Sequence, residues 1–386
     1  MTTTDLPETL ATAREIDQQP DVWRECAGIV SDRRPAIDAF LAPLLARPDL
    51  RIVLTGAGTS AFVGDIAAPA LTRLLGRRVD AVATTDLVSN PRQHLAEDLP
   101  TLLVSFARSG NSPESSAATV LADEVLTSVR HLVITCDPTG ALYLAHHGRD
   151  ASHVVLMPAL SNDSGFAMTS SFTSMLLAAL LIFTGDDDAA VSKLRAAASQ
   201  ILDDRRSEIT RLASSDFERV IYLGSGPLTG LARESALKLL ELTAGKVVTY
   251  YDSALGFRHG PKAVLDATTL VIVYLSSDEY TRRYDLDIVA ELRTTLSPER
   301  VVTVSATPVP ESTADDWVLA DLDGLDDSSL AVAYVVVAQL LGLSFSIALG
   351  MTPDNPFPDG SVNRVVRGVT IHPLTPSSGR AGRGEE

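Results

Sequence analysis

The chain has 386 residues, a length typical of two or three domains. Its 32 basic and 49 acidic residues give a net charge of −17, which argues against proteins that bind nucleic acid or anionic membranes by neutralising phosphates. With 45% hydrophobic and 21% charged residues, the composition indicates a soluble globular protein with a sizeable core and excludes a disordered one.

The N-terminal segment, residues 1–49, is predicted to be a helical extension. Its first twenty residues lack the basic and continuous apolar regions of a secretory signal. The only cysteines, Cys26 and Cys136, cannot build a disulfide framework or a cysteine-based zinc site within one chain. We therefore expect a cytoplasmic protein.

A repeat organises the next three hundred residues. Two β-rich runs end in glycine turns at Gly58 and Gly226, an offset of 168 residues. Further strand-like runs follow in matching order at Thr101–Ser105 and Thr269–Val273, Leu132–Thr135 and Val301–Ser305, and His153–Met157 and Trp317–Leu319. Strands that alternate with helices build a parallel sheet covered on both faces. The sequence thus predicts a duplicated α/β domain with four strands in each copy, at residues 50–185 and 216–350.

Three segments outside the strands complete this organisation. Residues 186–215 are predicted to form a linking helix on the surface. Leu330–Gly350 is long and apolar enough for a membrane span, but its acidic flanks and internal polar residues favour a buried helix. Residues 351–386 are expected to return to the body of the protein and to end in a disordered tail.

The first glycine turn, Gly56-Ala-Gly58-Thr59-Ser60-Ala61, opens a helix whose free N–H groups could bind an anion. The same letters satisfy the loose dinucleotide pattern, and Asp80 lies at a suitable distance to bind a ribose hydroxyl. A nicotinamide-dependent enzyme therefore stays open as an alternative at this point.

The end of the second strand favours phosphate more clearly. Residues 105–115 place an arginine, a glycine and several short hydroxyl side chains at a strand-to-helix corner, followed by Pro113 at a first helical turn. Backbone N–H groups and serine hydroxyls supply the many donors that a phosphate needs. An ordinary capped helix start is the alternative, but the neighbouring Gly-Thr-Ser turn favours a phosphate cradle.

The helix after Gly226 carries the most informative charges. Glu234, Lys238 and Glu241 stand at i, i+4 and i+7, so they share one face of a helix that is otherwise rich in leucine and alanine. A solvated ion pair is the alternative, yet so narrow a stripe favours a polar cleft with a carboxylate suited to proton transfer. Further on, His259 precedes Gly-Pro in a constrained loop, as a positioned acid or base would. The histidines show no metal-ligand spacing, so no metal is expected.

These motifs resemble the double sugar-isomerase (SIS) fold of the isomerase half of glucosamine-6-phosphate synthase. More closely, 15–20 (EIDQQP) with Trp23, 165–171 (GFAMTSS), 255–262 (LGFRHGPK) and 363–371 (NRVVRGVTI) resemble the bacterial tagatose-6-phosphate ketose/aldose isomerase family, also described as galactosamine-6-phosphate deaminases. The resemblance covers nearly the whole chain. It implies two tandem SIS domains, each a three-layer α/β/α, flavodoxin-like unit, and an enzyme that needs no cofactor.

The resemblance also implies roles for particular residues. A sugar phosphate would be held by the first domain, through the loops that contain Gly58, Thr59, Ser60, Arg108, Ser109, Asn111 and Ser112. Glu241 would move a proton between C1 and C2, supported by Lys238 and Glu234. His259 would help to open the sugar ring, and because the synthase borrows this histidine from a neighbouring subunit, a homodimer with a shared site is implied.

Four departures from the synthase stand out. Ala107 replaces a hydroxyl residue and Arg108 replaces a glutamine, so the phosphate contacts there are expected to differ. A catalytic N-terminal cysteine is missing at Met1-Thr2-Thr3, so glutamine-dependent synthesis is not expected. In the C-terminal segment, which also offers Arg364 for binding, Arg367 stands in place of a lysine; arginine stays protonated, so its expected role is electrostatic.

The sequence thus favours an aldose–ketose isomerase or deaminase that converts galactosamine 6-phosphate and water into tagatose 6-phosphate and ammonia. Other hexosamine, fructosamine or hexose 6-phosphates remain alternative substrates, including sugar phosphates linked to amino acids. A sugar-phosphate sensor without catalysis is a further alternative. Neither nucleic acid nor membrane is expected as a partner.

Overall fold

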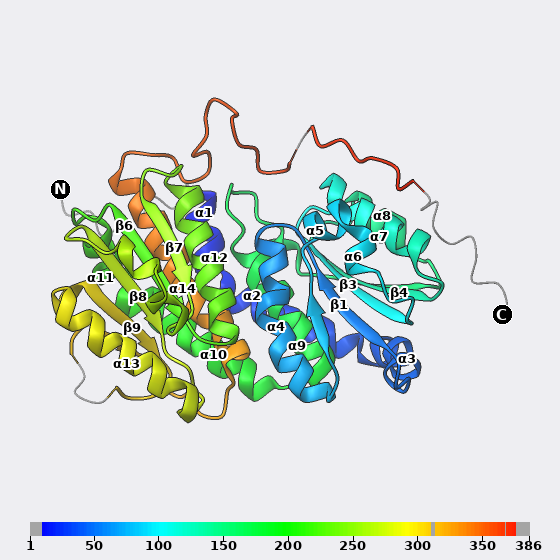
Figure 1. Ribbon diagram of the computed structural model, residues 1–386, viewed down its shortest axis with the longest axis horizontal. Coiled ribbons are helices and arrows are strands. Elements are labelled where there is room, and N and C mark those ends of the chain that lie inside the picture. The colour runs from blue at the N-terminus through cyan, green and yellow to red at the C-terminus, as the bar shows by residue number, and fades with distance from the viewer. Residues whose placement is uncertain (1–9, 310–312, 367, 376–386) are drawn as a thin grey trace, which may run out of the picture.

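The computed structural model describes residues 10–309, 313–366 and 368–375, and it contains two five-stranded parallel sheets (Figure 1). The strands are β1 (Arg51–Thr55), β2 (Val79–Ala81), β3 (Thr101–Ala107), β4 (Val129–Thr135), β5 (Ser152–Leu156), β6 (Arg219–Gly224), β7 (Val248–Asp252), β8 (Thr269–Tyr274), β9 (Val301–Ser305) and β10 (Asp316–Val318). The orders β2-β1-β3-β4-β5 and β10-β9-β8-β6-β7 are one topology written in opposite directions. This is the flavodoxin-like order, so the predicted fold class and its duplication are confirmed.

Helices before, between and after the strands build the layers around both sheets. In the first half they are α1 (Ala11–Asp17), α2 (Gln19–Asp32), α3 (Arg34–Leu45), α4 (Thr59–Leu75), α5 (Thr84–Ser89), α6 (Pro91–His94), α7 (Pro113–Val125), α8 (Ala141–His146) and α9 (Ser170–Thr184). They continue as α10 (Asp188–Gln200), a π-helical turn (Ile201–Arg205), α11 (Arg206–Ala213), α12 (Pro227–Leu242), α13 (Glu279–Thr295) and α14 (Asp327–Ala348). The predicted linking helix is therefore a helical run with an irregular turn in its middle.

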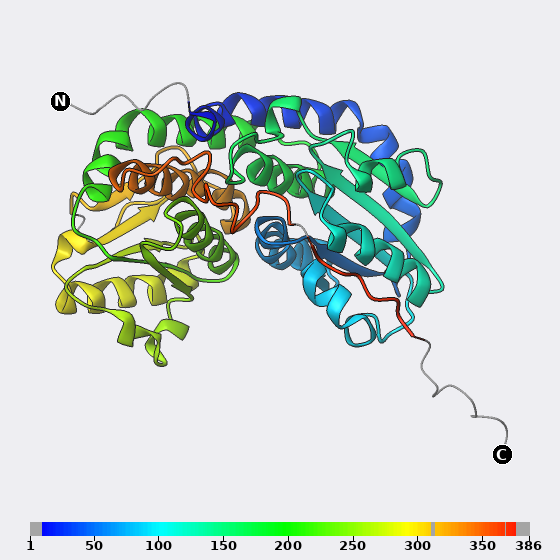
Figure 2. The ribbon, with the colours of Figure 1, turned by 90° about the horizontal axis from the view of Figure 1, so that it is seen from above.

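One hydrophobic core joins the two halves. Alternate strand residues such as Leu54 and Val104 in the first sheet, and Tyr222 and Ile272 in the second, belong to the same buried cluster as the inner helices α4, α9, α12 and α14. The opposite strand faces pack against outer helices, α5 to α7 in the first half and α13 in the second. Because α12 packs against both α4 and α14, the central helices fix the two sheets relative to each other (Figure 2).

The prediction of four strands in each half was wrong by one strand. The structure adds β2 beside β1 and β7 beside β6, each at the edge of its sheet. β2 has only three residues, and β7 alternates exposed and half-buried positions. An edge strand needs no continuous apolar run, because only one of its sides is paired and its faces are partly open to water.

The helix α14 contains the apolar segment that resembled a membrane span. It is the one helix in the described ranges that is long and apolar enough to cross a membrane, and 94% of its apolar window is buried inside the protein. Its internal Gln339 accepts a hydrogen bond from Gln19 Nε2 at 2.7 Å. The prediction of a buried helix is therefore confirmed.

After α14 the chain runs as an extended strap across the first half (Figures 1 and 2). Asp354 binds the first turn of α1, accepting from the Ala11 and Thr12 amides at 2.8 Å and from the Thr12 hydroxyl at 2.6 Å. Farther along, Phe357 packs against Phe166 with ring centroids 5.3 Å apart. The strap thus connects the N-terminal helices to the loop before α9.

Two buried histidines contact each other between β4 and α8, away from the glycine turns: His131 belongs to β4 and His146 ends α8. His131 Nε2 lies 2.9 Å from Asp123 Oδ1, and His146 Nδ1 lies 2.8 Å from Ser152 Oγ. Burial, and then the charges of His131 and Arg149, lower the pKa of His146 to about 4. Burial likewise lowers the pKa of His131.

We predict that this pair makes the fold sensitive to acid. The unfolded chain binds a proton near pH 6.5 and the folded His146 only near pH 4, so stability falls as the pH drops through that window, by about 3 kcal/mol. Chemical denaturation from pH 7 to 4 should show a flatter profile for His146→Gln. The exposed neighbour provides the control, His147→Gln; if both variants follow the parent profile, the pair is not responsible.

Candidate active site

Each glycine turn places a helix N-terminus at the carboxyl edge of its sheet. Gly58 and Gly226 both have positive φ, 55° and 56°, which suits glycine and directs the chain from the strand into α4 or α12. A Cβ on Gly56 would lie 2.5 Å from the Ser60 backbone, so the turn also requires close approach. The first helical N–H groups of α4 therefore face the point where the chain order reverses between β1 and β3, which is where open α/β sheets bind ligands.

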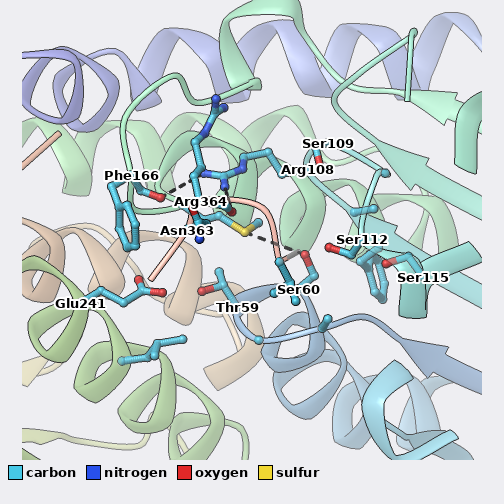
Figure 3. Close-up of a pocket in the computed structure, with 18 of the residues that line it drawn as sticks. Thr59, Ser60, Arg108, Ser109, Ser112, Ser115, Phe166, Glu241, Asn363 and Arg364 are labelled. Atoms are coloured by element: carbon cyan, nitrogen blue, oxygen red, sulfur yellow. Dashed lines mark hydrogen bonds between the residues drawn. The ribbon is translucent and has the colours of Figure 1, made fainter. Parts of the chain in front are cut away.

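A cavity of about 230 Å³ lies at this point (Figure 3). Its floor comes from the α4 turn, one wall from the loop between β3 and α7, and a second wall from α12 of the other half. The strap and the loop before α9 cover it with Arg364 and Phe166. The structure thus assembles segments that are up to three hundred residues apart in the sequence.

One end of the cavity is lined with hydroxyl groups. Ser60, Ser109, Ser112 and Ser115 surround it, and Gly110 turns the chain there with φ of 63°. Thr59 also lines the cavity but lies nearer to Glu241 (Figure 3). Hydroxyl and amide donors at two helix starts, α4 and α7, converge on one small space. This arrangement suits the oxygens of a phosphate group.

Arg108 adds a buried positive charge to the same cavity. Its guanidinium donates to the Phe166 carbonyl at 3.3 Å and to the Arg364 carbonyl at 3.0 Å, and in the described part of the chain it forms no ion pair with a carboxylate. Burial, followed by the nearby Arg364 charge, lowers the pKa of Arg108. A buried cation held only by carbonyl groups favours an anionic ligand beside it.

The opposite end of the cavity carries the acidic group. Glu241 reaches the cavity from α12, across from Ser112 and Ser115 (Figure 3). Lys238 Nζ lies 2.6 Å from Glu241 Oε2 and 3.5 Å from Glu234 Oε1. The predicted triad is therefore assembled, with Lys238 and Glu234 fully buried behind Glu241 and outside the cavity lining.

The protonation states within this triad differ. Burial raises the pKa of Glu234 to about 8, although Lys238 opposes the shift. For Lys238, burial lowers the pKa, but the carboxylates of Glu234 and Glu241 outweigh it and the net shift is upward. At neutral pH the triad is best described as a Lys238 cation paired with Glu241, beside a largely protonated Glu234. Glu241 is then available to the cavity as a carboxylate held in place by Lys238.

The strap supplies the remaining polar groups. Asn363 and Arg364 line the cavity between Val362 and Val366, and Arg364 donates a hydrogen bond to the Asp163 carbonyl. Arg367 lies outside the residues that the structure describes, so its predicted electrostatic role stays a prediction.

Two predicted residues lie apart from the cavity of their own chain. Asn111 is exposed, and its side-chain oxygen accepts from the Ala141 amide at 3.0 Å, which caps α8. His259 is exposed between two short 3₁₀ turns, Gly256–Arg258 and Pro261–Val264, on the second half. The ion pairs of Glu291 with Arg258, at 2.8 Å, and with Lys262 hold this loop.

Sequence reasoning missed most of the apolar walls. Phe166, Met168, Leu237, Val362 and Val366 line the cavity without having been singled out as site residues. Phe166 and Met168 belong to the 165–171 motif, which was noted only as a family likeness. Ser115 belongs to the predicted phosphate segment, and its position in the first turn of α7 is the signal that could have indicated it as a site residue.

The equivalent point in the second half has a different chemistry. A cavity of about 560 Å³ lies at the start of α12, next to the loop after β8. There Asp327 accepts from the Ser276 hydroxyl at 2.5 Å, the Ser277 amide at 2.7 Å and the Ser277 hydroxyl at 2.9 Å. The Asp327 carboxylate thus occupies the hydrogen-bond donors that a phosphate would need, and its negative charge would repel a phosphate. Of the two switch points, the first is suited to bind phosphate.

The dinucleotide alternative loses its main support. Asp80 is bound by Arg51 at 3.1 Å and by Arg78 at 2.6 Å, so its carboxylate is already occupied by two cations. A ribose hydroxyl would have to displace them. For metals, the described residues contain no group of three or more His, Cys, Asp or Glu side chains placed to hold an ion.

Comparisons with known proteins agree with this geometry. The SIS domain family matches residues 44–185, which contain the first sheet. The AgaS protein of Streptomyces coelicolor is 59% identical over 94% of this chain and 95% of its own length. D-galactosamine-6-phosphate deaminase AgaS of Shewanella sp. (strain ANA-3) is 45% identical over 94% of this chain and 92% of its own length.

A solved structure extends the agreement to the fold. The crystal structure of tagatose-6-phosphate ketose/aldose isomerase from Escherichia coli has a TM-score of 0.88 and 42% identity, covering 95% of this chain and 98% of that one. The resemblance inferred from the motifs is therefore confirmed. The chain belongs to the AgaS family of galactosamine-6-phosphate deaminases and tagatose-6-phosphate ketose/aldose isomerases.

Proposed function

We propose that the protein is a phosphosugar isomerase that acts as a deaminase, converting D-galactosamine 6-phosphate and water into tagatose 6-phosphate and ammonia. One observation carries the proposal: a single cavity holds a buried, unpaired arginine and a set of serine hydroxyls at one end, and a lysine-held carboxylate at the other. The names of relatives that cover nearly the whole chain support the same substrate class.

The geometry supports a definite division of labour. The phosphate binds at Ser60, Ser109 and Ser112, with Arg108 offsetting its charge. The C1–C2 end of the open sugar then lies toward Glu241. Glu241 removes the C2 proton to give an enolamine, and protonation at C1 leaves an imine at C2. Water adds to this imine, and ammonia leaves as the ketose forms.

Lys238 and Glu234 act behind the base. Lys238 holds the Glu241 carboxylate by a charge-assisted hydrogen bond of 2.6 Å, which fixes its orientation toward the cavity. Glu234, largely protonated, leaves the lysine charge available to Glu241. A positioned carboxylate of this kind typically contributes about 10²–10⁴ to a rate.

We also propose that two copies form the active unit. His259 is exposed on its own chain and lies apart from the cavity lining, so a second copy would have to present it for it to act on the sugar. Apolar side chains at the edge strand β7 and nearby, namely Leu240, Val248, Tyr250 and Leu255, are exposed and suit such an interface. Each chain would bind one phosphosugar, in its first half. Two buried free thiols fit a reducing cytoplasm.

A panel of substrates tests the proposed function. Ammonia and ketose 6-phosphate should both be released from galactosamine 6-phosphate, in equal amounts and faster than from glucosamine 6-phosphate, fructosamine 6-phosphate or plain hexose 6-phosphates. Galactosamine without its phosphate should react far more slowly, because the serine cluster and Arg108 would have no anion to bind. Tight binding of these compounds without any turnover would instead indicate a sensor.

A further inference from the structure

Two of the family-like motifs have no part in the proposed chemistry, yet they contact each other directly. Residues 15–20 lie at the junction of α1 and α2, and residues 165–171 lead into α9. The Ser170 hydroxyl donates to the Glu15 carbonyl at 2.6 Å, and Gln18 Nε2 donates to the Ser170 hydroxyl at 3.1 Å. These contacts join segments about 150 residues apart and lie outside both sheets.

The side chain of Glu15 is the centre of this junction. It is 4% exposed, and its carboxylate accepts from the Ser164 amide at 2.5 Å, the Ser164 hydroxyl at 2.6 Å and the Gly165 amide at 3.1 Å. A Cβ on Gly165 would lie 2.9 Å from Glu15 Oε2, so a larger residue there would push the carboxylate away from the loop. In the described chain Glu15 has no cationic partner, and its charge is met by these donors alone.

The loop that Glu15 holds also holds both arginines of the cavity. The Asp163 carbonyl, one residue before Ser164, accepts from Arg364, and the Phe166 carbonyl, one residue after Gly165, accepts from Arg108. The next turn, at Thr169 and Ser170, is fixed by the Asp163 carboxylate, which accepts from their amides at 2.8 and 3.0 Å. Two hydrogen bonds and the short loop between them thus separate Glu15 from each guanidinium. Figure 3 shows the bond from Arg108 to the Phe166 carbonyl.

We infer that Glu15 is a positioning residue for phosphate binding: by fixing the 163–166 loop, it holds the Phe166 carbonyl that orients the Arg108 guanidinium for the phosphate, and the Asp163 carbonyl that binds Arg364 of the strap. This inference rests on the proposed function and assigns a task within it to the N-terminal extension. The two carbonyls would shift if the carboxylate were lost, and charge-assisted contacts are sensitive to shifts of an ångström or less.

The substitution Glu15→Gln tests the inference with the least change of shape. Its NH₂ group would face a backbone N–H instead of accepting from it, so the loop would move. We expect the KM for the sugar phosphate and the inhibition constant of inorganic phosphate to rise together, about tenfold, with kcat changed less than about twofold. A role in stability alone would lower the folded fraction and leave both constants unchanged.

Three further variants separate the possible outcomes. Glu25→Gln, an exposed change of the same kind on α2, should behave as the parent does. Ser164→Ala removes one donor to Glu15 and should raise KM by a smaller factor, and it carries the test if Glu15→Gln does not fold. Suppose that phosphate inhibits Glu15→Gln and Ser164→Ala as it does the parent, but inhibits Arg108→Gln less. That result would overturn the inference about Glu15 and leave the proposed phosphate site standing. If Arg108→Gln also binds phosphate normally, the proposed phosphate site is wrong.

Discussion

Replacing Glu241 by glutamine should lower kcat for ammonia release by about a thousandfold, with little change in KM. Glutamine keeps the size of the side chain and can still contact Lys238, but it cannot take a proton from C2. The phosphate contacts lie at the other end of the cavity, so substrate binding should persist. Steady-state kinetics, combined with loss of solvent hydrogen exchange at C2, would measure the effect. A Glu241→Gln enzyme with normal kcat would remove Glu241 from the role of base.

The same variant tests whether the active site is shared between two copies. His259→Ala alone should be impaired, because the partner's cavity would lack its ring-opening group. After unfolding and joint refolding of Glu241→Gln with His259→Ala, half of the dimers are mixed, and each mixed dimer has one cavity with both native residues. Activity should then recover to about one quarter of the parent value. No recovery in proven mixed dimers would place His259 outside the partner's site.

The duplicated fold could be predicted because its central strands are continuous apolar runs. Such runs as Thr101–Ser105 and Thr269–Val273 are buried on both faces, and strands of this kind need consecutive apolar residues. Edge strands do not, so their sequence pattern is weaker. β7, with its tyrosines and Asp252, is paired on one side and partly exposed, so it has no continuous apolar run that would predict a strand.

The site was predictable where its residues share one element. Glu234, Lys238 and Glu241 share a face of α12, and helical spacing alone brings them together. The roof of the cavity could not be derived in this way. Phe166 comes from a loop and Val362 from the strap, and their meeting depends on packing between distant segments. The same holds for Asp327, at the start of α14. It occupies the serine donors of the second half, about fifty residues earlier in the chain, and so disfavours phosphate there.

The buried lysine of the triad should be as important for folding as for catalysis. Lys238 is fully buried, and it is the cation that contacts both Glu234 and Glu241. In Lys238→Met the two carboxyl groups lose that charge in a site with no access to water for Glu234. We expect the free energy of unfolding at pH 8 to fall by about 3 kcal/mol and kcat to drop at least about a hundredfold.

The pH dependence of this loss identifies its cause. Without Lys238, folded Glu234 must keep its proton to higher pH, and a carboxyl group whose folded pKa is raised destabilises the fold more as the pH rises. Because parent Glu234 is itself protonated below about pH 8, the deficit of Lys238→Met should grow from pH 7 to pH 9, and adding Glu234→Gln should remove that pH dependence. Lys246→Met, an exposed change just beyond the same helix, is the matched control. Denaturant unfolding at the two pH values measures all four proteins; a Lys238→Met deficit that is equal at both would mean that lost packing, rather than lost charge, causes it.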